Sequence, residues 1–115
     1  MPIKFFNYML LKLKIIKVEN KIPGLIKRMG FNCKRVFHIG AIGINPESLA
    51  IWIVTQSDKE KEMLRDNFLK INSEVKGLLI EAGYPADAIN YTGVDFESQE
   101  TVDRDYKGSW WSCMK

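Results

Sequence analysis

The chain has 115 residues and a net charge of +3, with 46% hydrophobic and 27% charged side chains. This length suits a single domain, and the composition is that of a globular protein and excludes an intrinsically disordered chain. We therefore expect residues 1–115 to form one domain. The two cysteines, Cys33 and Cys113, are too few for the disulfide framework of a small secreted protein, so free thiols and a cytoplasmic location are predicted.

The charge is distributed unevenly along the chain. Residues 1–35 carry nine basic side chains against one acidic side chain, whereas residues 36–115 carry eight basic and thirteen acidic ones. A basic end can face nucleic acid, anionic lipid or an acidic protein. Pairing with the acidic half of the same fold is the favoured interpretation.

The apolar run at residues 5–11 is too short to cross a bilayer, which takes about 20 residues. Lys12, Lys14 and Lys17 follow it, and no small-residue cleavage site is present, so neither a transmembrane segment nor a secretory signal is predicted. The mixture of apolar and basic side chains is still compatible with an amphipathic helix on a membrane surface.

The first predicted element is a helix at residues 3–29. Its apolar residues recur at helical spacing: Leu11, Ile15, Val18, Ile22, Leu25, Ile26 and Met29. Pro23 should kink this helix or divide it into segments 3–20 and 23–29. Residues 1–20 also fit a strand, because Leu13 and Ile15 alternate with lysines, so helix and strand both stay open for this segment.

A β-hairpin is predicted next, from strands at residues 36–44 and 49–55. The sequence Asn-Pro-Glu-Ser at residues 45–48 between them is typical of a turn. Both faces of the segment 49–54 are apolar, because Leu49, Ile51 and Ile53 alternate with alanine, tryptophan and valine. A strand that is apolar on both faces is usually central in its sheet.

The clearest helix is predicted between residues 58 and 82. Ser57 and Glu60 form a capping box at its start, and Gly83 and Pro85 end it. Its apolar stripe consists of Leu64, Phe68, Ile71, Val75, Leu78, Leu79 and Ala82. The same spacing occurs 53 residues earlier in the first helix, which indicates two units of equivalent architecture.

The second unit is completed by a predicted hairpin that pairs residues 89–97 with residues 106–114. The predicted fold class is therefore α+β, with two α-β-β units, a four-stranded and mostly antiparallel sheet, and both helices on one face.

The sequence contains no motif that specifies a reaction, and we expect no catalytic residue, no cofactor, no metal and no small-molecule substrate. His38 is the one histidine, which excludes a two-histidine metal site. Cys33 and His38 could pair as a thiolate and its base, but a structural strand histidine is the favoured interpretation. The segment 40–43, Gly-Ala-Ile-Gly, lacks the pattern of a phosphate-binding loop.

Nucleic-acid binding is the alternative function, based on the basic N-terminal segment. Aromatic residues that could stack on bases accompany the lysines: Phe5, Phe6, Tyr8, Phe31 and Phe37. Their spacing is that of helical core residues, however, and the acidic second half of the chain would repel phosphates. Nucleic acid is therefore not the preferred partner.

Candidate partner-binding residues cluster near the C-terminus. They are Asp95, Glu97, Glu100, Asp103, Asp105, Tyr106, Trp110 and Trp111. The carboxylates are expected at a solvated hairpin tip that receives a basic partner, although a metal or acid–base site is the alternative. Adjacent strand residues point to opposite faces, so either Trp110 or Trp111 should face outward as a binding hot spot.

The stretches at residues 94–103 (VDFESQETVD) and 108–115 (GSWWSCMK) resemble the C-terminal ends of small bacterial proteins. Those proteins are similar to the immunity partners of polymorphic and contact-dependent inhibition toxins. The resemblance covers the last third of the chain and transfers no functional residue. It implies a non-enzymatic cytosolic protein that binds and blocks the catalytic domain of a cognate toxin. A basic nuclease is the expected toxin, because carboxylates of an inhibitor can occupy phosphate positions.

Overall fold

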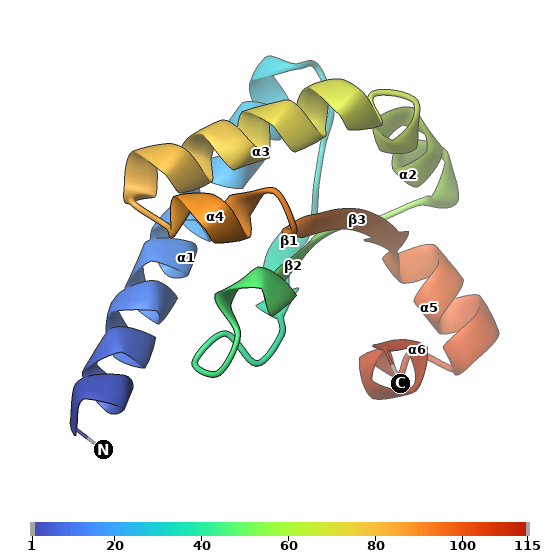
Figure 1. Ribbon diagram of the computed structural model, residues 1–115. Coiled ribbons are helices and arrows are strands. Elements are labelled where there is room, and N and C mark those ends of the chain that lie inside the picture. Colours follow the sequence, from blue (N-terminus) through green and yellow to red (C-terminus); the bar gives the residue numbers. More distant parts are fainter. Residues whose placement is uncertain (1, 115) are drawn as a thin grey trace.

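The computed structural model describes the backbone of residues 2–114 and the side chains of residues 7–114. Helices and strands mix along the chain, which confirms the α+β class (Figure 1). The elements are α1 (Pro2–Arg28), β1 (Arg35–Ile39), a 3-10 turn η1 (Pro46–Ser48), β2 (Ala50–Thr55), α2 (Asp58–Arg65), α3 (Phe68–Ala82), α4 (Ala86–Ile89), β3 (Gly93–Ser98), α5 (Gln99–Tyr106) and α6 (Trp110–Met114).

The sheet of the described residues has three strands in the order β1-β2-β3. The predicted first hairpin is present, since β1 and β2 are antiparallel with Val36 opposite Ile53. β3 runs parallel to β2, with Phe96 opposite Ile53. The central place of β2 agrees with its two apolar faces, because a central strand is covered on both.

The predicted four-stranded antiparallel sheet is wrong, and so is the second α-β-β unit. Residues 106–114 form no strand with β3, because residues 99–106 and 110–114 are the helices α5 and α6. Ser98 begins α5 as its N-cap, where its hydroxyl accepts the Thr101 backbone N–H. β3 pairs with β2 instead, and the three helices between them are long enough to return the chain for a parallel pairing.

The first helix runs unbroken from Pro2 to Arg28 with Pro23 inside it, so of the two predicted effects of this proline, a kink or a division, the division is wrong. The sequence left helix and strand open for residues 1–20, and residues 2–20 are helical as part of α1. Val18, Ile22 and Leu25 on both sides of Pro23 are buried on one face. This shared packing outweighs the local cost of an interior proline, about 3 kcal/mol.

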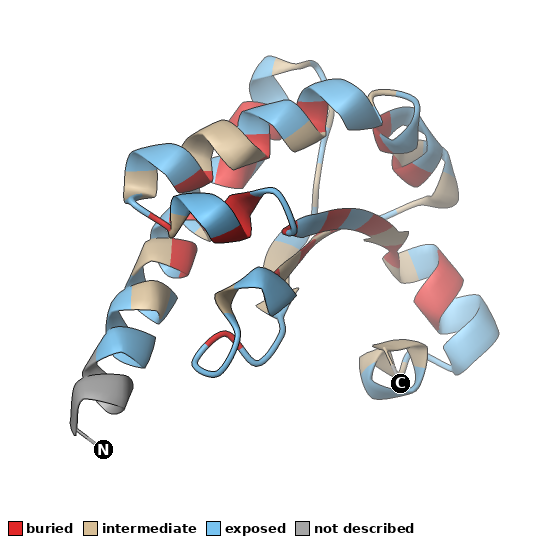
Figure 2. Ribbon diagram, viewed as in Figure 1, coloured by how far each residue is buried: buried red, intermediate tan, exposed pale blue. Residues whose placement is uncertain are grey.

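The core lies between the sheet and the two long helices, where buried residues line the facing surfaces (Figure 2). Ile15 and Ile22 of α1 and Ile71 and Leu79 of α3 are fully buried there, as their helical spacing predicts. His38 of β1 bonds Glu19 of α1, which identifies the face of the sheet that α1 covers. Side chains alternate along a strand, so the neighbours of His38 point to the opposite face, called the outer face below.

The predicted helix at residues 58–82 is divided in two by Asp66 and Asn67. Phe68, the first residue of α3 after this break, is 39% exposed, so the burial that its place in the predicted apolar stripe implies is wrong for this residue. Phe68 meets the buried Phe96 of β3 edge to face, with ring centroids 6.3 Å apart. The predicted capping box of Ser57 and Glu60 is present at the start of α2.

The two rings of this pair provide a test of the core. Phe96 is 1% exposed, so Phe96→Ala should lower the free energy of unfolding by about 3–5 kcal/mol, as truncation of a buried aromatic does. Phe68→Ala should cost clearly less, because solvent already reaches that ring. Urea unfolding of both variants followed by circular dichroism measures the difference. Equal losses would contradict the placement of Phe68.

Candidate functional site

Aromatic side chains gather on the outer face of the sheet. Phe37 of β1 and Trp52 of β2 stack there, with ring centroids 6.5 Å apart and planes 10° from parallel. Trp110 of α6 meets Phe37 edge to face at 5.7 Å. The Arg35 guanidinium carbon lies 5.0 Å from the Phe37 ring centre and 4.8 Å from that of Trp110. Aromatic and cation–π contacts therefore hold α6 against the sheet.

A groove of about 610 Å³ opens beside these contacts. The aromatic groove, as we call it, is lined by Arg35, Phe37, Ile39, Trp110, Trp111 and Met114. Trp111 is 75% exposed and Ile39 is 41% exposed, so two large apolar side chains of the groove remain in contact with water. Large exposed apolar side chains that gather around one groove make it a candidate site for a binding partner.

Local sequence directs α6 into this position. Lys107 adopts a left-handed conformation with φ 53°, and Gly108 follows with φ 79°. The Gly108 N–H then donates to the Val102 carbonyl at 2.9 Å, which ends α5 and reverses the chain. The Trp110 indole N–H donates to the Gln99 side chain at 3.0 Å, so the first residue of α6 is tied to the first residue of α5.

The adjacent residues Trp110 and Trp111 have different roles. Trp110 packs against Phe37 and is half-buried, whereas Trp111 points into solvent. The residue that faces outward is therefore Trp111, although both lie in a helix and not in the predicted strand. Tyr106, at the end of α5, is 38% exposed and does not line the groove.

The predicted carboxylates lie outside the groove, on β3 and α5. Asp95 is exposed on the outer face, in register with Trp52 of the neighbouring strand. Glu100 accepts the backbone N–H of Asp58 at 3.1 Å, and Asp103 accepts the Gln99 amide at 2.9 Å. Asp105 pairs with Arg104 at 3.1 Å. These exposed carboxylates, Asp95 of β3 and Glu100, Asp103 and Asp105 of α5, are called the acidic flank below.

Glu97 differs from the other predicted carboxylates because it is mostly buried in an ion pair. The buried ammonium of Lys61 donates to Glu97 at 2.9 Å and to the Thr101 hydroxyl at 3.0 Å. The side chains of Glu97 and Lys61 are 14% and 10% exposed. The pair joins α2 to β3, so Glu97 acts in the fold and offers little surface to a partner.

Asp58, the first residue of α2, extends the same network. Its carboxylate accepts the Ser98 and Thr101 hydroxyls and pairs with the Arg104 guanidinium at 2.7 Å. These hydrogen bonds, with the Arg104 charge in addition, hold the pKa of Asp58 well below its ordinary value of 3.8. The network therefore ties the N-terminus of α2 to the first turns of α5, which carries α6 and the groove.

Sequence reasoning missed Arg35, Phe37, Ile39 and Met114 as members of the site. Arg35, Phe37 and Ile39 are alternate residues of β1, so they lie on one face of the sheet. This alternation is visible in the sequence and could have grouped the three residues. Which element covers that face depends on how the C-terminus folds back, and no local pattern in the sequence specifies this.

The structure places His38 and both cysteines, the residues considered for cysteine and metal chemistry. His38 bonds Glu19, and burial raises the pKa of the Cys33 thiol, which disfavours a thiolate nucleophile. Burial and the charge of Glu97 also raise the pKa of Cys113. Within residues 2–114, as far as their side chains are described, no three metal-ligating side chains converge.

Two of the aromatic residues considered for nucleic-acid stacking take part in other contacts of the fold. Phe31 packs against the core, and Phe37 lies on the outer face of the sheet, away from α1. Tyr8 does lie beside a lysine, with Lys12 Nζ 6.0 Å from its ring centre. Phe5 and Phe6 lie outside the residues whose side chains are described.

No protein-family model matches the chain, and neither a curated protein nor a solved structure is similar enough to it to count as a match.

The network at Asp58 predicts a pH dependence of stability. Its folded pKa lies below the ordinary value of 3.8 expected for the unfolded chain, so the stabilisation is complete above that value and is lost as the pH falls through the folded pKa. Asp58→Asn should lower the free energy of unfolding at neutral pH and flatten its decline below about pH 4. Urea unfolding across this range measures both effects. Asp87→Asn, at an exposed aspartate of α4, is the control, and an equal change there would contradict the role of the network.

Proposed function

We propose that this chain is a non-enzymatic immunity protein that binds the catalytic domain of a bacterial toxin through the aromatic groove. The observation that carries the proposal is the exposed Trp111 beside Arg35 and Phe37 at the mouth of an open groove. Tryptophan and arginine are enriched among the residues that contribute most of the binding energy in protein interfaces, and such residues seat in pockets.

The groove is also preorganised for binding. Phe37 is fixed by strand pairing and by its stack with Trp52, and the Arg35 guanidinium is held between two rings. Side chains that are already ordered lose less conformational entropy when a partner binds, so more of the contact energy appears as affinity.

The acidic flank supports a basic partner. Asp95, Asp103 and Asp105 are exposed on β3 and α5, close in sequence to the tryptophans. Exposed charges of one sign steer an oppositely charged partner and raise the association rate. A nuclease toxin, whose active site is basic because it binds phosphates, fits this flank. Carboxylates of the inhibitor would then occupy phosphate positions in the toxin.

The resemblance to immunity proteins adds the biological class. It lies in residues 94–103 and 108–115, and the second stretch contributes Trp110, Trp111 and Met114 to the groove. Such a protein acts in the cytoplasm, where a nuclease toxin reaches its substrate. Among the described residues no helix is long and apolar enough to cross a membrane.

The central prediction concerns Trp111. The candidate partner is a toxin encoded by a gene next to that of this protein. Trp111→Ala should speed dissociation from this toxin and weaken binding by about 2 kcal/mol or more. The variant loses an exposed binding side chain but no contact in the core. Tyr91→Ala is the matched control, since Tyr91 is 70% exposed and lies outside the groove. Binding kinetics on immobilised toxin and survival of cells that express both proteins are the measurements.

If Trp111→Ala binds and protects as the wild type does, the aromatic groove is not the inhibitory surface. If the wild-type protein protects against no neighbouring toxin, the immunity function itself is refuted.

A second prediction distinguishes exposed charges, which raise the association rate, from Trp111, which slows dissociation. Reversal of Asp95 and Asp105 to lysine should mainly slow association, with a smaller effect at high salt, because exposed charges act at long range. Glu97 is unsuitable for this test, since its ion pair with Lys61 supports the fold. The same kinetic assay at low and high ionic strength gives the answer. An unchanged association rate would contradict an acidic docking flank.

A further inference from the structure

Helix α1 carries apolar side chains on a face that the fold leaves open. Met9, Leu13 and Ile16 are 43%, 58% and 40% exposed. They recur at intervals of four and three residues, so they form one stripe along the helix. Ile15 and Val18 on the other side of the helix are buried in the core. The fold therefore uses one apolar face of α1 and leaves the outward stripe without an intramolecular partner among the described residues.

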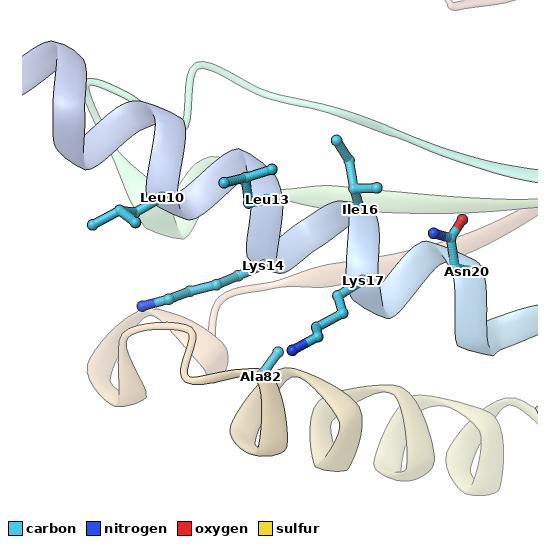
Figure 3. Close-up of a pocket in the computed structure, with 7 residues that line it drawn as sticks. All are labelled: Leu10, Leu13, Lys14, Ile16, Lys17, Asn20 and Ala82. Carbon is cyan, nitrogen blue, oxygen red and sulfur yellow. The ribbon is translucent and has the colours of Figure 1, made fainter.

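Exposed lysines lie on both sides of this stripe. At 3.6 residues per turn, Lys12 falls on one side of Leu13 and Lys17 on the other. Figure 3 shows Leu13 and Ile16 directed away from α3. A groove of about 420 Å³ runs beside the stripe, and its lining includes Leu10, Leu13, Ile16 and Lys17.

Lys14 has a separate role. Its ammonium donates to the Gly83 carbonyl at 3.0 Å, so it satisfies the C-terminal end of α3 and joins the two long helices. Lys14 therefore belongs to the fold, whereas Lys12 and Lys17 remain exposed on the flanks of the stripe.

We propose that α1 docks on the surface of a bilayer that contains anionic lipid, with the outward stripe in contact with the membrane. Helices that lie in the interface insert an apolar face at the boundary of the acyl chains and place lysines at the headgroup phosphates. The arrangement of Met9, Leu13 and Ile16 between Lys12 and Lys17 has this form. Lys21, Lys27 and Arg28 are further exposed basic side chains of α1, and its acidic residue, Glu19, is bonded to His38, so the exposed charge of the helix is complementary to an anionic surface.

Other occupants fit the stripe less well. Nucleic acid would contact the lysines but would leave Met9, Leu13 and Ile16 in water, because these side chains offer no ring for a base to stack on. A second copy of the chain, paired symmetrically along the stripe, would bring lysines of like charge together at the seam. A lipid surface accepts both the apolar and the basic side chains.

The proposed contact is independent of toxin binding. α1 covers one face of the sheet, and α6 with the aromatic groove lies against the outer face. The stripe faces away from the core and thus away from the groove, so occupation of one surface leaves the other open.

The test is co-sedimentation of the full-length protein with phosphatidylcholine vesicles, with or without phosphatidylglycerol. The wild-type protein should bind the anionic vesicles about tenfold or more tightly than the neutral ones, and added salt should weaken the binding. Leu13→Asp combined with Ile16→Asp should weaken binding to anionic vesicles about tenfold or more, because charge replaces inserted apolar surface. Leu69→Asp is the matched control, since Leu69 is 82% exposed on α3, and it should bind as the wild type does.

Circular dichroism and thermal unfolding of each variant establish that the fold is retained. A second variant, Lys12→Glu with Lys17→Glu, keeps the apolar stripe and should lose the preference for anionic vesicles. The proposal is overturned if the wild type does not bind anionic vesicles, or if neither double variant reduces that binding. It is equally overturned if α1 instead binds an RNA or DNA oligonucleotide without any vesicle binding. Dimerisation that Leu13→Asp abolishes, again without vesicle binding, would assign the stripe to a second copy.

Discussion

The parallel pairing of β2 with β3 determines where the other elements lie. Parallel strands end at the same edge of the sheet, so the chain must return across it before β3 can form. The helices α2, α3 and α4 make this return, and α3 packs against α1 over the covered face. Both strands then continue into helices from one edge, with Ser57 and Ser98 as the N-caps of α2 and α5.

That shared edge explains the polar network. The first turns of α2 and α5 start side by side, which brings Asp58 and Lys61 to Thr101 and to Glu97 at the end of β3. A mostly buried ion pair adds little net stability compared with apolar packing, but removal of one partner is costly because it leaves an unpaired buried charge. The network thus fixes the relative position of the two helices. α5 holds α6, and α6 forms one wall of the aromatic groove, so the groove depends on residues that do not line it.

Local signals in the sequence were sufficient for the elements with strong periodicity or capping. The capping box of Ser57 predicted the start of α2, the apolar stripe predicted α3, and the apolar faces of β2 predicted a central strand, whereas the break between α2 and α3 was not predicted. α5 was missed because its eight residues bury little more than Thr101 and Val102, too few for a visible helical period. Ser98 at its start and Lys107 with Gly108 at its end are the signals that could have identified it.

Tertiary packing decided the remaining features. The proline in α1 is tolerated because core residues lie on both sides of it, and Phe68 is partly exposed in the first turn of α3, directly after the break that separates it from α2. The candidate site could be predicted only in part. Trp110 and Trp111 were singled out from the sequence, but their partners Arg35 and Phe37 lie more than 70 residues earlier and join them only in the folded chain.

The division of roles between the adjacent tryptophans follows from the length of α6. A helix of five residues has almost no stability of its own, because nucleation costs more than one turn of hydrogen bonds returns. α6 must therefore be held from outside, and Trp110 does this through Phe37, Arg35 and Gln99. With that anchor in place, the next residue of a helix points about 100° away around the axis. Trp111 is thereby turned toward solvent. Because Trp110 already fixes α6, a partner that binds Trp111 does not have to order this helix first.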